Sequence, residues 1–241
     1  MRNLRIMRKL DKIQVFQVST GFFGAFDCAA VQTLLLALKC RDVNTYFHSM
    51  RVSGLASEMG SILGLSARSL EELAIAGLLH DIGKIGLPDS VLQKSGRLSK
   101  TERGVVTQHP ELSASIIAPL PGFERVREII VQHHERFDGS GYPGIRKSDG
   151  IMMEARVLTI ADAFDAMVSE RPYRDPLSSR EALAQIEREV GTQFCPVGFQ
   201  ALLEVFREGQ RLEPGRQREI RTGIDSLVTT LGTPKSLTLC L

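Results

Sequence analysis

The chain has 241 residues, enough for one substantial domain with short terminal segments. Hydrophobic residues make up 43% of the chain and charged residues 24%, which is typical of a globular protein with a real core. The formal net charge of +2 is too balanced for a general nucleic-acid binder, which would carry a basic stripe, so we expect no nucleic-acid polymer as a partner.

The N-terminal segment, residues 1–26, begins with several basic residues, and its role is not assigned by any pattern. From Asp27 onward apolar residues recur at helical spacing, and few segments are typical of strands. We therefore expect an all-α domain over residues 27–208, followed by a tail over 209–241 that is partly helical or mobile. In chain order the periodicity predicts helices around residues 48–59, 70–79, 123–133, 157–167, 182–190 and 199–206. Two loops of functional character are expected, over 88–98 and 137–150, and the second is rich in turn residues.

The histidines are the most informative residues. All five fall in four short local strings: His48-Ser49-Met50-Arg51-Val52, His80-Asp81-Ile82-Gly83-Lys84, His109-Pro110, and His133-His134-Glu135. A further string, from Ala161 to Ala166, carries Asp162 and Asp165. Neutral imidazole and carboxylate oxygen together are ligands for divalent transition metals. A single histidine is more often structural, but five strings in one order favour a metal site.

These strings carry a family resemblance. His80-Asp81, then His133-His134-Glu135, then Asp138-Gly139-Ser140-Gly141-Tyr142-Pro143 resemble the HD-GYP family of metal-dependent phosphodiesterases, over residues 34–206. The resemblance implies an HD-type helical bundle with a di-metal site in a central cleft. It also implies hydrolysis of cyclic di-GMP in bacterial second-messenger signalling, and docking of a diguanylate cyclase domain through the Gly141-Tyr142-Pro143 loop.

The resemblance also implies a ligand set. One metal takes His48, His80, Asp81 and Asp162, and the other takes Asp81, His109, His133 and His134. Asp81 is expected to bridge, because each oxygen of a carboxylate can bind one cation. Open positions for water and substrate suit iron or manganese better than a closed structural zinc site, and they argue against a metal used only for stability.

The expected chemistry needs no serine or cysteine nucleophile. Two metals about 3.5–4 Å apart lower the pKa of a bridging water, which then attacks phosphorus in line with the departing ribose oxygen. Asp81 and Lys84 are the expected catalytic residues. Lys84 follows Asp81 by three positions and shares its helical face, so it is the natural cation for a substrate phosphate. The alternative is a surface lysine that reaches into water.

Further residues are expected around the metals. Arg171 and Arg174 match the family's basic substrate-binding pair, since the planar guanidinium pairs bidentately with phosphate, although a solvent-facing pair is the alternative. Tyr142 is expected to stack on a base or to hold its loop against the cleft. Glu135 and Asp165 are expected to orient histidine ligands by accepting an N–H bond.

Three positions depart from the family pattern. Ser113 replaces a usual glycine and Cys195 a usual aspartate, and neither is expected to contact a ligand. Asn44 stands where some members place a carboxylate for a third metal, and an amide is a poorer ligand for a dication. We therefore expect two divalent ions.

The sequence leaves the substrate and the compartment as expectations. The main expectation is cleavage of cyclic di-GMP to linear pGpG and on to GMP. The alternatives are a phosphodiesterase for another cyclic dinucleotide such as cyclic GMP-AMP, or a non-hydrolytic sensor or docking module. The four cysteines, Cys28, Cys40, Cys195 and Cys240, have no paired spacing, and the apolar stretch at 29–38 is too short to span a bilayer. We therefore expect a cytoplasmic protein without a membrane span.

Overall fold

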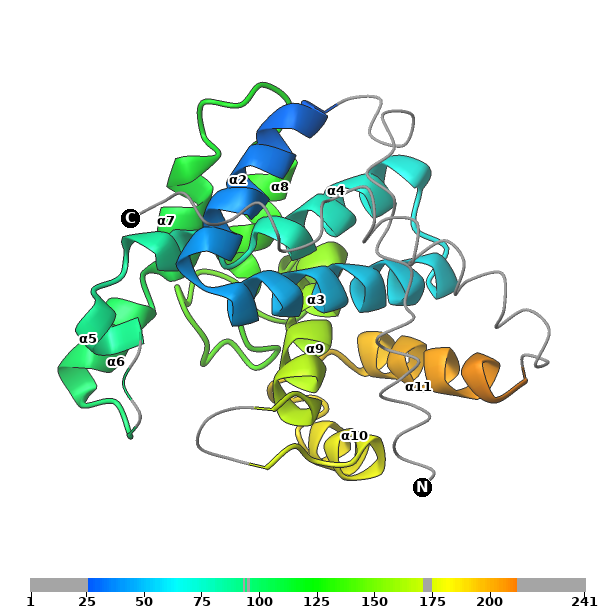
Figure 1. The fold of residues 1–241 in the computed structure, drawn as a ribbon. Coiled ribbons are helices and arrows are strands. Elements are labelled where there is room, and N and C mark those ends of the chain that lie inside the picture. Colours follow the sequence, from blue (N-terminus) through cyan, green and yellow to red (C-terminus); the bar gives the residue numbers. More distant parts are fainter. Residues whose placement is uncertain (1–25, 93, 95, 171–174, 212–241) are drawn as a thin grey trace, which may run out of the picture.

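The computed structural model describes residues 26–92, 94, 96–170 and 175–211 of the chain. These residues form helices joined by turns and irregular segments, and they contain no β-strand, only an isolated bridge between Val190 and Phe194 (Figure 1). The prediction of an all-α fold is therefore confirmed. The helices are α2 (Cys28–Arg41), α3 (Val43–Ile62), α4 (Ala67–Leu79), α5 (Asp89–Leu92), α6 (Lys100–Val106), α7 (His109–Ile116), α8 (Glu124–Gln132), α9 (Met153–Val168), α10 (Ser179–Arg188) and α11 (Pro196–Arg211), with short 3-10 turns η1 (Ile82–Gly86) and η2 (Ser148–Gly150).

Local capping explains where several helices begin. The Asp42 carboxylate accepts hydrogen bonds from the backbone N–H groups of Asn44 and Thr45 and so starts α3. The Ser66 hydroxyl caps α4 in the same way. A capping box between Ser178 and Glu181 starts α10. Each cap satisfies N–H groups that have no partner inside the helix, which fixes the helix start in the sequence.

Helix α3 crosses the middle of the molecule and packs against α4, α9 and α11 (Figure 1). Its predicted apolar stripe is confirmed, because Val52, Leu55 and Met59 are almost completely buried. Burial of each such side chain contributes about 1.5–3 kcal/mol. The stripe therefore anchors α3, and with it His48, in the centre of the fold.

The contact between α3 and α4 is unusually close. A Cβ on Gly77 would lie 2.6 Å from the Cα of Ser53, so only glycine fits there. At the same crossing the Ser53 hydroxyl donates to the carbonyl oxygen of Ala74 at 2.7 Å. This approach brings the end of α4, where His80 lies, toward the helix that carries His48.

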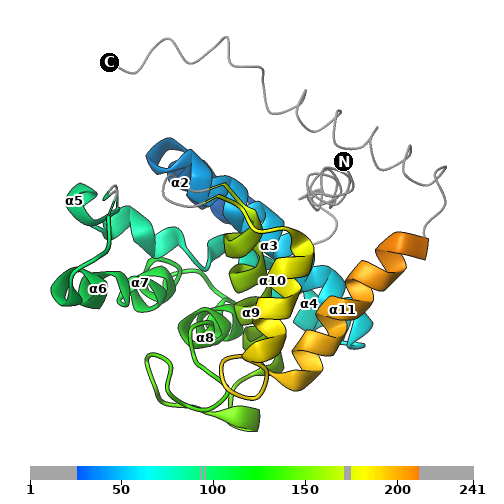
Figure 2. The same ribbon diagram turned by 90° about the horizontal axis from the view of Figure 1, so that it is seen from below.

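The predicted loop at 88–98 is only partly correct. Helix α5 begins at Asp89, and Ser99 with Glu102 forms a capping box that starts α6. The α5–α6 pair projects from the side opposite α11, as both ribbon views show (Figure 2). The other expected loop, at 137–150, is irregular until η2. The expected domain boundary at residue 208 falls inside α11.

Among the described residues, no helix combines the length and the apolar character that crossing a bilayer would require.

Candidate metal centre

The centre is built around the end of α4. His80 is the last residue with helical geometry, and at Asp81 the backbone leaves the α-helix (φ −101°, ψ 3°) and enters η1. Asp81 therefore does not lie one helical step from His80. The change of direction turns its carboxylate into the centre, where its side chain is 3% exposed.

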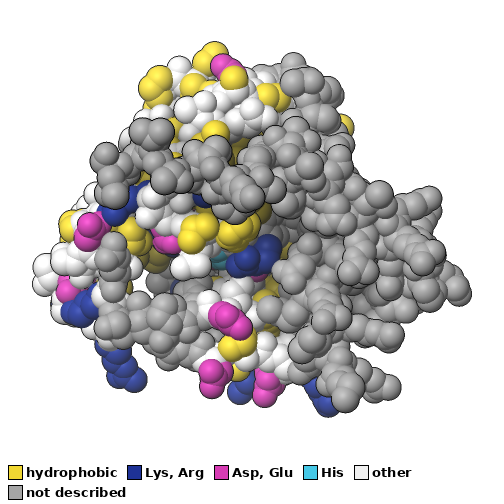
Figure 3. All heavy atoms as spheres, in the orientation of Figure 1, with side chains coloured by type: hydrophobic (Ala, Val, Ile, Leu, Met, Phe, Trp, Pro, Cys, Tyr) yellow, Lys and Arg dark blue, Asp and Glu magenta, His cyan; other side chains and the backbone are white. Residues whose placement is uncertain are grey.

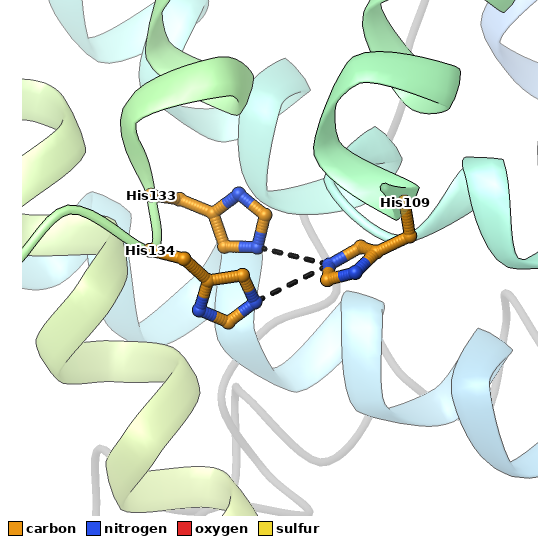
Figure 4. Close-up of side chains that lie close together, drawn as sticks. All are labelled: His109, His133 and His134. Atoms are coloured by element: carbon orange, nitrogen blue, oxygen red, sulfur yellow. Dashed lines mark hydrogen bonds between the residues drawn. The ribbon is translucent and has the colours of Figure 1, made fainter. Parts of the chain in front are cut away.

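Three histidines meet at one end of the centre (Figure 4). His109 begins α7, His133 closes α8, and His134 follows it directly. The Nε2 atom of His109 lies 3.4 Å from Nε2 of His133 and 3.2 Å from Nε2 of His134. Neutral imidazole lone pairs at this distance repel one another unless a proton or a cation lies between them, so this group has the arrangement of a cation site.

A second group lies beside it. His48, His80 and Asp162 each offer one ligand atom, all within 4.8 Å of one another. The Nε2 atom of His48 lies 3.0 Å from Oδ1 of Asp162. These residues come from α3, the end of α4 and α9, so the group exists only in the packed bundle.

Asp81 lies between the two groups. Its Oδ1 is 3.3 Å from Nε2 of His109, while its Oδ2 is 3.4 Å from Nε2 of His80 and 3.8 Å from that of His48. The two oxygens thus face different groups, as a bridging carboxylate requires. Lys84, from η1, places its Nζ 2.6 Å from the same Oδ2 and stays 26% exposed.

Backbone carbonyls orient three of the rings. Nδ1 of His80 donates to Gly77, Nδ1 of His109 to Val106, and Nδ1 of His133 to Ile130, at 2.5–2.8 Å. Each acceptor is the carbonyl three residues earlier in the chain. This bond leaves Nε2 as the free lone pair of a neutral ring. Within the described residues, Nε2 of His80 is buried without a hydrogen-bond partner.

The electrostatics suit a dication. Burial lowers the pKa of His80, His109 and His133, and it lowers that of His134 to about 4, so these rings are neutral near pH 7. Burial alone would raise the pKa of Asp81, but Lys84 and the neighbouring histidines hold it well below its usual range. The pKa of Asp162 is lowered mainly by its hydrogen bond with His48, against the effect of burial. Two ionised carboxylates among neutral imidazoles are a donor set for divalent cations.

His48 is the exception among the rings. Burial would lower its pKa, but hydrogen bonds with Asp162 and Asp165 raise it to about 9. Nδ1 of His48 donates to Oδ2 of Asp165 at 2.7 Å. Asp165 thus contacts a proposed ligand in the way that was expected.

The expectation for Glu135 is wrong in this structure. Its carboxylate accepts backbone N–H bonds from Gly144, Ile145 and Arg146 at 2.8–3.2 Å and contacts no histidine ring. Adjacency to His134 does not bring the carboxylate to the centre, because the chain turns away after His134. Glu135 therefore orders the loop that contains Tyr142.

That loop packs directly on the histidines. The centroid of the Tyr142 ring lies 4.7 Å from that of the His134 ring, and the two planes are tilted by 33°. The backbone N–H of Tyr142 donates to the carbonyl oxygen of His134 at 3.1 Å. A Cβ on Gly141 would overlap the backbone of His134 and Arg136, so glycine is required there. Of the two expectations for Tyr142, contact that holds the loop against the centre is the one visible here.

The expectation that Ser113 touches no ligand is also wrong. Its buried hydroxyl donates to the carbonyl oxygen of His80 at 2.7 Å and accepts from the N–H of Gly83 at 2.8 Å. Cys195, in contrast, is buried beside Arg156, whose Nη1 lies 3.6 Å from its Sγ.

Sequence reasoning missed Arg51. It stands in the first histidine string, and its guanidinium donates two hydrogen bonds to the Asp165 carboxylate, one from Nε and one from Nη2. Its position three residues after His48, on the same helical face, was the available signal. Asn44 is exposed, and Arg171 and Arg174 lie outside the described residues.

The centre is almost enclosed. His80, Asp81, His109 and His133 are buried, whereas His48 and Asp162 keep 12% and 19% of their side chains exposed. In the view of Figure 3, a small area of histidine surface is visible between other described residues. The partly exposed residues mark the side from which solvent reaches the centre.

Known proteins resemble this chain across the same region. A family model described as an HD domain matches residues 31–196. A cyclic di-GMP phosphodiesterase of Thermotoga maritima is 37% identical over 180 residues, which are 74% of this chain and 49% of the relative. A 3'3'-cGAMP-specific phosphodiesterase 2 of Vibrio cholerae is 32% identical, covering 74% of this chain and 34% of that protein.

Solved structures agree on the fold. A cyclic GMP-AMP-specific phosphodiesterase of V. cholerae superposes with a TM-score of 0.60 at 22% identity, covering 80% of this chain and 52% of the other. The chain spans half or less of the length of the curated relatives named above. The matched region contains every residue of the two metal-ligand groups, and the chain therefore belongs to the HD domain family, in its HD-GYP branch.

Proposed function

We propose that this chain is a metal-dependent phosphodiesterase that hydrolyses cyclic di-GMP. The single observation that carries the proposal is Asp81, whose two oxygens face two separate groups of histidines. The named relatives that share this region include a cyclic di-GMP phosphodiesterase, which supports the substrate.

We propose two metal sites. The first uses His48, His80, Asp81 and Asp162, and the second uses Asp81, His109, His133 and His134. The grouping of ligand atoms supports this division. His48, His80 and Asp162 form one group, and His109, His133 and His134 form another. Asp81 forms a third group with one histidine of each, His80 and His133. Exposed Asn44 offers no carboxylate for a third ion. The nitrogen and oxygen donors support iron or manganese.

Divalent ions held there would supply Lewis acidity for the phosphoryl oxygens and would lower the pKa of a water. The residues of the chain have separate tasks. Asp81 keeps the two sites at a fixed separation. The Lys84 ammonium, 26% exposed and beside that carboxylate, is positioned to pair with a substrate phosphate. Arg171 and Arg174 complete the proposed phosphate contacts, and Tyr142 borders the site through His134.

We propose that ring opening to linear pGpG is the faster step and that the second cut, to GMP, is slower. The linear product has lost the preorganisation of the ring and must be ordered again on binding. A chromatographic time course distinguishes the two. Mononucleotide that accumulates without any linear intermediate would contradict the order.

Cyclic GMP-AMP is the second candidate substrate. The similarity to a relative named as specific for 3'3'-cGAMP supports it. The two substrates differ in one base, so the choice depends on contacts to base edges and leaves the metal chemistry unchanged.

The decisive experiment is a turnover assay under anaerobic conditions with Mn(II) or Fe(II). Cyclic di-GMP, cyclic GMP-AMP and cyclic di-AMP are compared at equal concentration. We expect cyclic di-GMP to be cleaved most efficiently, and His80→Ala to be inactive, while Glu128→Ala, an exposed change on α8, keeps wild-type turnover. Binding of cyclic di-GMP without cleavage by the metal-loaded protein would instead identify a sensor.

Two finer features belong to the same proposal. The Gly141-Tyr142-Pro143 loop, followed by Ile145 at 68% exposure, is proposed to dock a diguanylate cyclase domain. The free thiols of Cys28, Cys40 and Cys195 support action in the reducing cytoplasm.

A further inference from the structure

The Asp165 carboxylate is bound by three side chains at once. It accepts from Nδ1 of His48 at 2.7 Å, and Arg51 donates to both its oxygens, from Nε to Oδ1 at 2.7 Å and from Nη2 to Oδ2 at 2.9 Å. The Ser169 hydroxyl lies 3.1 Å from Oδ2 and also accepts from Arg51 at 3.0 Å. Asp165 is only 3% exposed, so few alternative partners are available to it.

Two pairs of residues with the same three-residue spacing link α3 to α9. On α3, Arg51 follows His48 by three residues, and on α9 Asp165 follows Asp162 by three. His48 contacts both carboxylates, with Nε2 facing Asp162 and Nδ1 facing Asp165. The ring direction of His48 is therefore set by where the Asp165 carboxylate is held.

A bidentate guanidinium fixes that carboxylate more completely than a single bond does. Two parallel N–H bonds from a planar fork define both the position and the plane of the acceptor. Without Arg51, Asp165 could rotate about its side-chain bonds while keeping one bond to His48. The Nε2 atom of His48 would then no longer be held toward Asp162.

We infer that Arg51 is a positioning residue for the metal group of His48, His80 and Asp162, acting through Asp165. The inference rests on the proposed function, because it assumes that this group holds a divalent ion. Arg51 itself contacts neither the proposed metal ligands His80 and Asp162 nor His48 by any hydrogen bond of the described chain.

A purely structural salt bridge is the competing explanation, and the chain offers a matched control. Arg125, on α8, donates to the buried carboxylates of Glu72 and Glu154, on α4 and α9. It also joins helices through buried acids, but neither of its acids contacts a histidine of the centre in any described contact. Loss of Arg125 should affect stability alone.

The test compares Arg51→Gln, Arg51→Lys and Arg125→Gln in the full chain. Mn(II) binding is measured by calorimetry, the coupled or isolated state of the bound ions by electron paramagnetic resonance, and the melting temperature of the metal-free protein by circular dichroism. We expect Arg51→Gln to bind one of two Mn(II) ions about 10- to 100-fold more weakly, the scale for partners that orient a ligand. Arg51→Lys keeps the charge without the fork and should lie between. Arg125→Gln should lower the melting temperature and keep wild-type affinity.

A double variant tests the route. In the background of Asp165→Asn, the change Arg51→Gln should weaken Mn(II) binding less than it does in the wild type, because the shared acceptor is already altered. Independent, additive losses would overturn the action through Asp165.

The other outcomes separate the inference from the proposed function. If the wild type binds two Mn(II) ions and cleaves substrate while folded Arg51→Gln binds both with unchanged affinity, the inference is overturned and the function stands. If Arg51→Gln does not fold, wild-type affinity in Arg51→Lys overturns it equally. If the wild type binds no Mn(II), both are overturned.

Discussion

The hydroxyl of Ser113 donates to the carbonyl oxygen of His80 at 2.7 Å, and so joins α7 to the turn that carries the HD pair. The Ser113 hydroxyl oxygen in turn accepts the N–H of Gly83 at 2.8 Å, and all three residues are buried. A Cβ on Gly83 would overlap the backbone of His109 and Ser113. A larger residue at this position would therefore push the turn away from α7 and break the Ser113 hydrogen bonds.

Ser113→Ala removes this link. Two buried backbone groups lose their partner, and we expect a loss of about 1–3 kcal/mol in the free energy of unfolding, with weaker metal binding because the turn positions Asp81. Denaturant unfolding and metal titration measure the two effects. Ser115→Ala, an exposed serine on the same helix, is the control. Equal stability of the two variants would contradict the prediction.

Asp81→Ala tests the bridge. We expect turnover to be abolished and metal content to fall, since both groups lose an oxygen, while the helical circular dichroism spectrum persists. Elemental analysis gives the metal content per chain for each variant. Full activity in Asp81→Ala would refute the two-metal arrangement.

The number of ions is measured separately. Crystals of the wild type examined at a metal absorption edge should show two strong anomalous peaks, and three peaks would refute the two-metal arrangement.

Glu135→Ala separates the loop from the metals. Three loop N–H bonds to a buried carboxylate are lost, so we expect a decrease of about 1.5–3 kcal/mol in stability and faster proteolysis between residues 143 and 147. Metal content should remain at the wild-type level, because Glu135 contacts no histidine ring. If the variant loses its metal as well as the order of the loop, the prediction is wrong and the loop and the centre depend on each other.

Acid should destabilise the metal-free protein through its buried rings. Burial lowers the pKa of His134 from 6.5 to about 4, so the unfolded chain binds the proton more readily than the folded one. The stabilising contribution is present above pH 6.5 and is lost as the pH falls toward 4, by up to about 3 kcal/mol for this residue. Unfolding free energies of chelator-treated wild type and His134→Gln at pH 7 and pH 5 measure it. The variant should lose less stability over this interval, and an identical loss would contradict the assignment to His134.

The sequence alone determined the all-α fold and several of its core helices, and it predicted the types of ligand. Helical periods and capping residues act within a few positions of the chain, so the stripe of Val52, Leu55 and Met59 and the helix ending at His80 followed from local pattern. Ligand identity was equally local, because histidines and aspartates stand in short strings whose chemistry does not depend on the fold. The HD-domain family model over residues 31–196 agrees with the family that these strings resemble.

Only the tertiary structure decided which acid supports which ring. Asp165 reaches His48 across 117 positions and Arg51 across 114, whereas Glu135, adjacent to a histidine in sequence, turns to its own loop. Ser113 reaches the carbonyl of His80 across 33 positions. These contacts depend on how closely α3, α4, α7 and α9 cross and on the direction of each side chain at the crossing. Periodicity along one helix contains neither quantity, because both are set by the packing of the whole bundle.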